Sequence, residues 1–146
     1  MLVRDYLPTA SKRLITLTPD DTIQEAARRL APAGFDLIVI VDGAGKMIGV
    51  VTDSDIVNWV ATHEGQATRQ TKVSTIMSTK TTKCLPSQSL SDVAELAQKN
   101  GRKHLPIVDE NEIPLGVVYV RDALMALLND AEINERWLNA YFTGST

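Results

Sequence analysis

The chain of 146 residues contains the same pattern twice, and this repeat constrains its fold more than any other feature. The segment AGFDLIVIVDGAGKMIGVVTDSDIV, residues 33–57, aligns without a gap with NGRKHLPIVDENEIPLGVVYVRDAL, residues 100–124. Equivalent positions, such as Asp42 and Asp109, are 67 residues apart throughout. Self-similarity at one spacing indicates repeated units, none of which buries its apolar face alone. The sequence therefore predicts two tandem units, residues 1–66 and 67–128, followed by a C-terminal helical tail, residues 129–146.

Each unit is expected to contain an amphipathic helix near its start. In the first unit, Thr22 followed by Glu25 has the spacing of a capping box at a helix start. In the second unit, Ser89 and Asp92 take the same two positions. Apolar residues then recur at helical spacing, which predicts a buried face in each helix. These residues are Ile23, Ala26, Ala27 and Leu30 in the first unit and Leu90, Val93, Ala94 and Ala97 in the second.

A β-hairpin and a second helix follow in each unit. In the first, the apolar runs 37–41 and 47–51 are separated by the turn sequence DGAGK. A further short strand is expected within LITL, residues 14–17. The second helix is expected to bury Ile56, Val57 and Val60 in the first unit and Ala123, Leu124, Leu127 and Leu128 in the second.

The predicted fold class is therefore α/β, of the α+β type. Each unit would be a small sheet with two packing helices. A single unit of this kind leaves one face of its sheet uncovered. Two units related by a pseudo-twofold axis would bury that face.

Composition argues against several classes of protein. A net charge of −3 gives no basic excess for nucleic acid or a membrane surface. The longest apolar run, residues 37–41, is far too short to span a bilayer, and the N-terminus lacks the apolar stretch of a secretory signal. Cys84 is the single cysteine, which fits a cytoplasmic location and allows no internal disulfide. With only two histidines in non-equivalent places, no metal site is expected.

The two copies resemble CBS domains, the family named after cystathionine β-synthase. The resemblance rests on GVVTDSD (49–55) and GVVYVRD (116–122), on HLPIVD (104–109), and on the Pro-x-x-Thr/Ser starts at Pro19 and Pro86. It covers residues 1–128, and the first copy departs from it with Val39 where the family has proline. Two tandem copies resemble a CBS pair, or Bateman module.

This resemblance implies a stand-alone, cytoplasmic, non-catalytic regulatory protein. CBS pairs commonly bind AMP, ADP, ATP, NAD or S-adenosylmethionine in the cleft between the two repeats. The chain would thus need no cofactor, would bind an adenine nucleotide as a ligand, and would report cellular energy state to a regulated protein that the sequence does not identify.

The ribose motif of the family is Gly-h-x-Thr/Ser-x-x-Asp, which Gly49, Thr52 and Asp55 match. The resemblance therefore implies that Asp55 and Thr52 bind a ribose. A carboxylate accepts hydrogen bonds from sugar hydroxyls, and a threonine hydroxyl both donates and accepts. A helix starting at about Ser54 is expected to present free N–H groups and its positive dipole end to an anion. Gly49 permits close approach of a ligand or of another backbone.

Adenine contacts are expected from the strand before the first helix. By resemblance these are Leu14, Ile15 and Thr16, together with the apolar residue Val50. In the second copy the ribose motif is incomplete, because Tyr119 stands where threonine is expected. Asp122 is retained, so a second, weaker site is expected there.

Phosphate contacts are expected from the second copy. In AMP-binding CBS pairs, basic residues of the partner repeat reach the phosphate, and the matching positions here are Lys103, His104 and Arg121. Ser54 is expected to add a contact from the first copy. Guanidinium and ammonium groups suit a phosphate well. This pattern favours AMP, ADP, ATP or NAD over S-adenosylmethionine, which has no phosphate.

Other interpretations of the same residues remain. Asp53 and Asp55 are also common types of residue in the first turn of a helix, and a catalytic carboxylate pair ranks low because no nucleophile accompanies them. Cys84 is expected to pack as a small apolar residue.

The tail places Ile133, Trp137, Leu138 and Tyr141 on one helical stripe. The resemblance adds the expectation of a homodimer. The alternative function is a ligand-free protein-interaction module that acts through the homodimer or a partner surface.

Overall fold

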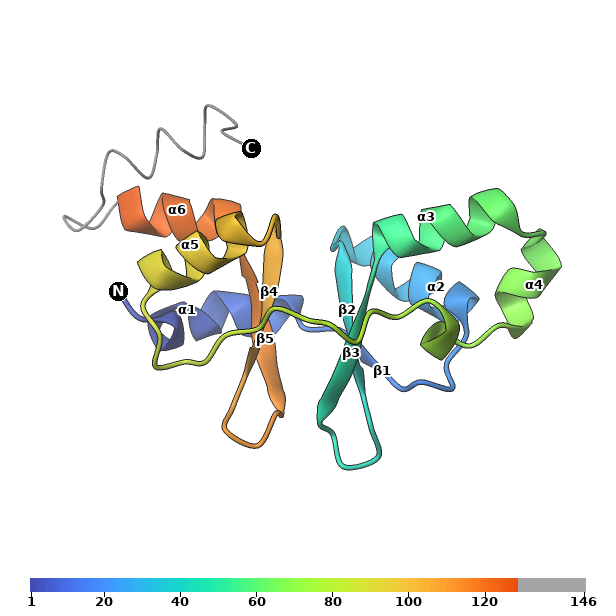
Figure 1. Ribbon diagram of the computed structural model, residues 1–146, viewed down its shortest axis with the longest axis horizontal. Coiled ribbons are helices and arrows are strands. Elements are labelled where there is room, and N and C mark those ends of the chain that lie inside the picture. The colour runs from blue at the N-terminus through green and yellow to red at the C-terminus, as the bar shows by residue number, and fades with distance from the viewer. Residues whose placement is uncertain (129–146) are drawn as a thin grey trace. The chain divides into compact units, whose positions relative to one another are not determined.

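The computed structural model describes residues 1–128, and it contains two compact units (Figure 1). The repeat-1 unit comprises Arg13–Thr81 and Asp109–Pro114. The repeat-2 unit comprises Met1–Lys12, Thr82–Val108 and the described residues from Leu115 onward. The predicted tail, residues 129–146, lies outside the described residues.

The repeat-1 unit contains a mixed three-stranded sheet in the order β1-β2-β3. Strand β1 (Thr16–Leu17) runs parallel to β2 (Leu37–Val41), and β2 pairs antiparallel with β3 (Met47–Thr52). The hairpin and the short first strand are therefore confirmed at the predicted positions. The helices of this unit are α2 (Ile23–Ala33), α3 (Asp53–Thr62) and α4 (Gly65–Gln70), with a 3₁₀ turn η2 at Val73–Thr75.

The repeat-2 unit contains the two-stranded sheet β4-β5, with strands His104–Val108 and Pro114–Tyr119. Its helices are α1 (Val3–Ala10), α5 (Leu90–Lys99) and α6 (Val120–Leu128), and a 3₁₀ turn η1 follows α1 at Ser11–Arg13. Cys84 forms a parallel bridge with Ile107, as Leu17 pairs with Ile40 at the equivalent positions of repeat 1. Cys84 thus occupies the position that β1 occupies in the other unit.

The first helix of each repeat is paired at its start with a segment from elsewhere in the chain. In the repeat-2 unit, Val3 N–H donates to the Gln88 carbonyl at 2.8 Å. In the repeat-1 unit, Val73 N–H donates to the Asp21 carbonyl, the equivalent acceptor, at 2.7 Å. The segment before repeat 1 therefore completes the repeat-2 unit, and the segment before repeat 2 completes the repeat-1 unit. The sequence repeats and the compact units are consequently different divisions of the chain.

The aspartate after the first hairpin strand has the same role in both repeats. Asp42 Oδ1 accepts hydrogen bonds from the N–H groups of Ala44 and Lys46, at 2.9 and 3.0 Å. Asp109 Oδ1 accepts the equivalent bonds at 2.8 and 3.0 Å. These aspartates close the hairpin turns, which assigns them a structural role.

The glycines that open the two strand-to-helix motifs lie against other backbone segments. A Cβ on Gly49 would lie 2.9 Å from the Ser78 carbonyl oxygen, and one on Gly116 would lie 2.7 Å from the Ala10 carbonyl carbon. Ser78 exchanges backbone hydrogen bonds with Val50, at 2.9 and 3.0 Å, so it pairs with the open edge of β3. The sequence predicted that a ligand or another backbone approaches Gly49 closely. In the structure, the chain's own backbone at Ser78 makes that approach.

The predicted buried face of α3 is only partly right. Ile56 is buried, but Val57 is 65% exposed and Val60 is 49% exposed. Trp59 packs against the repeat-1 core in their place. In α6, Ala123, Leu124 and Leu127 are buried as predicted, whereas Leu128 is exposed. Helical spacing identified the helices, but the direction of the inward face depends on how each helix lies on its sheet.

None of the helices within residues 1–128 combines the length and the apolar character that crossing a bilayer requires.

We predict that Gly49→Ala destabilises the protein by about 1–3 kcal/mol, because its Cβ would force the Ser78 backbone away from β3. Urea unfolding monitored by circular dichroism measures the effect. Gly43→Ala is the matched control, because a Cβ there meets nothing within 4 Å. Equal stabilities of the two variants would contradict the proposed role of the close contact.

Candidate functional site

The strand-to-helix turn of repeat 1 is built by a reciprocal capping box. Thr52 ends β3 and is the N-cap of α3. Its Oγ1 accepts a hydrogen bond from Asp55 N–H at 3.2 Å, while Asp55 Oδ2 accepts one from Thr52 N–H at 2.9 Å. Both side chains are half-buried. The two residues that the sequence matched to a ribose motif therefore hold each other in place.

The capping box leaves part of each side chain available to a ligand. No hydrogen bond is recorded for Asp55 Oδ1 within residues 1–128, and the Thr52 hydroxyl is recorded only as an acceptor there. The carboxylate can thus accept another hydrogen bond, and the hydroxyl can still donate one. The capping box by itself determines the orientation of both groups.

The expectation of free N–H groups at this helix start is wrong. Asp53 N–H donates to the Asp36 carbonyl at 3.0 Å, and Ser54 N–H donates to Asp53 Oδ1 at 2.8 Å. The Asp55 N–H is engaged with Thr52, as described above. The first-turn amides are therefore satisfied by the protein itself. Ser54 itself is exposed, so a contact from its hydroxyl remains a prediction.

The local charge also favours hydroxyl groups over an anion. We define the repeat-1 corner as residues 35–36 and 52–55, which the bond between Asp53 and Asp36 joins. It contains three carboxylates, on Asp36, Asp53 and Asp55, and no basic side chain. Carboxylates repel a phosphate and accept hydrogen bonds from sugar hydroxyls. By itself, this corner suits a ribose and not its phosphate.

The residues expected to contact adenine lie in the repeat-1 unit as well. Ile15 is buried, and its carbonyl accepts a hydrogen bond from Val39 N–H at 2.9 Å, which joins β1 to β2. Leu14 and Thr16 on either side are half-buried. The Val50 side chain is buried, and its backbone is paired with Ser78. A flat base would therefore have to use the half-buried side chains and the apolar surface near them.

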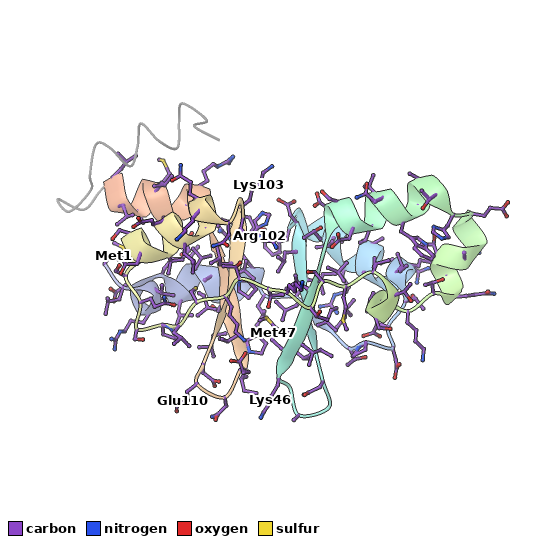
Figure 2. All side chains as sticks on the ribbon, in the orientation of Figure 1. Met1, Lys46, Met47, Arg102, Lys103 and Glu110 are labelled. Atoms are coloured by element: carbon purple, nitrogen blue, oxygen red, sulfur yellow. The ribbon has the colours of Figure 1, made fainter. Side chains whose placement is uncertain are left out.

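The equivalent turn of repeat 2 has the same backbone and opposite charge. We define the repeat-2 corner as residues 102–103 and 119–122, where Val120 N–H donates to the Lys103 carbonyl at 3.0 Å. Arg102, Lys103 and Arg121 outweigh the carboxylate of Asp122. The three basic side chains are exposed, and Figure 2 shows Arg102 and Lys103 beside the start of β4. In the repeat alignment Asp36 stands opposite Lys103, so the sequence already contains this change of charge. The structure adds that the two positions have equivalent backbones.

Tyr119 takes the position of Thr52 and has a different role. Its ring packs edge-on against the ring of His104, with the ring centroids 4.6 Å apart. His104 is half-buried at the start of β4. The aromatic pair occupies the side of the corner where repeat 1 has its capping threonine.

The sequence-predicted site residues thus fall into two sets. The set in the repeat-1 unit comprises Leu14, Ile15, Thr16, Val50, Thr52, Ser54 and Asp55. The set in the repeat-2 unit comprises Lys103, His104, Arg121 and Asp122. Within each set, the structure places the residues of the strand-to-helix turn side by side. Three residues that shape the two corners, or the strand beside them, were not among the predicted site residues. They are Asp36, Arg102 and Ser78.

Within residues 1–128, the structure forms neither a metal site nor a reactive cysteine. No group of three or more His, Cys, Asp or Glu side chains within residues 1–128 is arranged to hold a metal ion. Cys84 is buried, and burial raises the pKa of its thiol from 9.0 to about 12. A thiol with a raised pKa is a poor nucleophile at neutral pH, so the expected packing role of Cys84 is confirmed.

Comparisons with known proteins agree with this architecture. The family model for the CBS domain matches twice, over residues 3–62 and 73–129. A CBS domain-containing protein of Bacillus subtilis, YhcV, is 34% identical over 78% of this chain and 79% of its own length. The CBS-domain protein ATU1752 of Agrobacterium tumefaciens superposes with a TM-score of 0.74 at 26% identity, over 86% of this chain and 98% of that one.

A third similar structure contains bound ligands. The CBS domain pair of protein MJ0100, in complex with 5′-methylthioadenosine and S-adenosyl-L-methionine, has a TM-score of 0.74 at 26% identity. The match covers 88% of this chain and 96% of that chain.

The raised thiol pKa predicts a specific pH dependence of stability. Above pH 9 the unfolded chain loses the Cys84 proton, whereas the folded protein keeps it until about pH 12. The free energy of unfolding should therefore fall as pH rises through this range, by up to about 1.4 kcal/mol per pH unit. Urea unfolding of wild type and Cys84→Ala at pH 8 to 11 measures this contribution as the difference between their slopes. Identical slopes would show that the thiol ionises equally easily in both states.

Proposed function

Because this chain belongs to the CBS domain family, we propose that it is a non-catalytic regulatory module that binds an adenosine-containing ligand. The observation that carries this proposal is the turn formed by Thr52 and Asp55. A single ribose presents two neighbouring hydroxyls, and Asp55 Oδ1 is available to accept from them. The Thr52 hydroxyl is oriented by the same capping box and can donate to an oxygen of the ligand.

The remaining parts of the ligand follow from the surrounding residues. The adenine ring would contact Leu14, Ile15, Thr16 and Val50, which include buried and half-buried apolar side chains. The repeat-1 corner has three carboxylates and no basic side chain, so the predicted phosphate contact from the Ser54 hydroxyl would be its only one. The resemblance assigns the other phosphate contacts to Lys103, His104 and Arg121 of repeat 2, and we retain them as part of the proposal.

This division of roles defines the ligand classes that we propose. AMP, ADP, ATP and NAD would use residues of both repeats, and their binding would couple the module to cellular energy state. MJ0100 is similar to this chain and was solved with two adenosyl compounds that have no phosphate, which supports an adenosine ligand in general. We place S-adenosylmethionine second, because it would leave the basic residues of repeat 2 unused.

Asp122 would support at most a weaker second site, since Tyr119 replaces the threonine beside it. The ligand state would be read by a partner protein in the cytoplasm.

A ligand-free interaction module is the second candidate function. It is favoured by the saturated amides at the start of α3, which leave no backbone donor for a ligand phosphate. The two candidates make opposite predictions for ligand-induced stabilisation.

We predict that at least one of AMP, ADP, ATP, NAD and S-adenosylmethionine raises the melting temperature. A ligand at about 100 times its dissociation constant stabilises the folded state by about 2.7 kcal/mol, which corresponds to a rise of roughly 5–10 °C for a chain of this size. Differential scanning fluorimetry with each compound measures the rise. No shift with any of the five would favour the interaction module.

The asymmetry between the repeats gives a second prediction. Asp55→Ala should abolish the ligand-induced shift, whereas Asp122→Ala should reduce it much less. Asp55→Ala also removes half of a capping box, so each shift is measured against the ligand-free melting temperature of the same variant. Thr22→Ala removes the side-chain cap of α2 and is the control for lost capping without lost ligand contact. Equal losses in Asp55→Ala and Asp122→Ala would indicate two equivalent sites.

Removing the predicted phosphate contact should separate ligands by their charge. Arg121→Ala is expected to weaken AMP binding by roughly 10-fold or more, because a charge-assisted hydrogen bond contributes about 1.5–3 kcal/mol. Adenosine binding should change little. Isothermal titration calorimetry with both compounds gives the two ratios. An equal effect on AMP and adenosine would assign Arg121 a role other than phosphate binding.

A further inference from the structure

The last described helix, α6, exposes an apolar stripe up to the residue at which the tail begins. Met125 is 53% exposed and Leu128 is 43% exposed, and Arg121 is exposed one turn before them. We define these three residues as the α6 stripe. Their spacing, i, i+4, i+7, places them on one side of the helix, while the other side packs in the repeat-2 core. The stripe is therefore an apolar surface that needs a cover.

The sequence directly after α6 contains a second apolar stripe. We define the tail stripe as Ile133, Trp137, Leu138 and Tyr141, which helical spacing places on one side. The polar residues between them fall on the opposite side, and these are Glu132, Glu135, Arg136 and Asn139. Because isolated helices shorter than about 12–15 residues are marginal in water, a helix formed by this segment needs an apolar surface to pack on.

The connection between the two stripes suits an antiparallel helical hairpin. Only Asn129 and Asp130 separate Leu128 from the predicted tail helix, residues 131–142. Both are residue types that begin helices as N-caps, and short loops of this kind join antiparallel helices. With a rise of about 1.5 Å per residue, Ile133 would lie at a level between Leu128 and Met125. Trp137 would lie between Met125 and Arg121, so the side chains of the two helices would interdigitate.

The short connection favours the α6 stripe of the same molecule over other surfaces. Closing a loop of two residues costs little entropy, and it holds the tail at a high effective concentration beside α6. A second copy would have to overcome the loss of translational and rotational freedom. The other exposed apolar pair on a helix, Val57 and Val60 on α3, belongs to the repeat-1 unit.

We propose that residues 131–142 form a helix that folds back antiparallel on α6 of the same molecule, so that the tail stripe covers the α6 stripe. Burial of Met125 and Leu128 under the tail drives the docking, because removing apolar area from water is the main favourable term. The indole of Trp137 would stack on the guanidinium of Arg121. The proposal concerns the ligand-free protein and does not depend on nucleotide binding.

Thiol labelling of the full chain tests whether the tail covers α6. Met125→Cys should react with a maleimide about 10-fold or more faster when Trp137→Ala is added, because labelling then no longer requires the tail to open. Val57→Cys on α3 is the matched control, and Trp137→Ala should leave its rate unchanged. The native Cys84 reacts slowly in all variants, because it is buried and its thiol pKa is raised.

Hydrogen–deuterium exchange reports on the tail itself. Residues 131–142 should exchange about 10-fold or more slowly in the native chain than in urea, and Met125→Ser, Leu128→Ser and Trp137→Ala should each reduce this protection. Val57→Ser should not. Alanine favours a helix more than tryptophan does, so lost protection in Trp137→Ala reports lost packing and not lost helix propensity. Circular dichroism checks that each variant remains folded.

Three results would overturn the proposal. The first is equal labelling of Met125→Cys with and without Trp137→Ala. The second is acceleration of Val57→Cys by Trp137→Ala, which would assign the tail to α3. The third is protection of Met125→Cys and of the tail that increases with protein concentration, which would assign the cover to a second copy of the chain. All three measurements use ligand-free protein, so their outcome is separate from that of the proposed function.

Discussion

Each repeat is too small to form a stable core from its own hairpin and helices, and the other features of the structure follow from this constraint. The two-stranded β4-β5 sheet and the short β1-β2-β3 sheet are completed by segments that lie elsewhere in the sequence, Met1–Lys12 in one unit and the residues around Ser78 in the other. These segments must approach the sheets at backbone distance. Gly49 and Gly116 make that approach possible, because a side chain at either position would overlap the backbone of the covering segment. The glycine that opens the strand-to-helix motif therefore has a structural role.

The turn that follows these glycines has the same backbone in both repeats but side chains of opposite charge. In both repeats the first residue of the helix that follows the hairpin donates its N–H to the carbonyl of the residue before the hairpin, Asp36 in one case and Lys103 in the other. Because the backbones are equivalent, the two corners differ in their side chains. Three carboxylates in the repeat-1 corner favour sugar hydroxyls, whereas the basic groups of the repeat-2 corner favour anions.

Much of the fold could be predicted because it depends on local rules. The N-caps Thr22 and Ser89, the helical spacing of Ile23 and its neighbours, and the turn chemistry of Asp42 are local interactions that a sequence displays directly. The reciprocal half of the predicted capping boxes, from Glu25 and Asp92, is not formed among the described residues. The prediction failed where the outcome depended on what a residue meets in three dimensions. Val57 and Val60 have core-like character, but the inward position on α3 belongs to Trp59. The amides at the start of α3 were expected to be free, but Asp36 and Asp53 satisfy them.

In the candidate site, too, some features were determined by the sequence and others only by the tertiary structure. The sequence by itself determined that there are two CBS repeats, that Thr52 and Asp55 are retained in the first, and that Tyr119 replaces the threonine in the second. Only the tertiary structure decided that Thr52 and Asp55 hold each other, that Tyr119 packs on His104, and that Asp36 and Asp53 make the first corner acidic. The physical reason is that residue identity and periodicity are properties of the chain, whereas hydrogen-bond saturation and the sum of nearby charges depend on which segments the fold brings together.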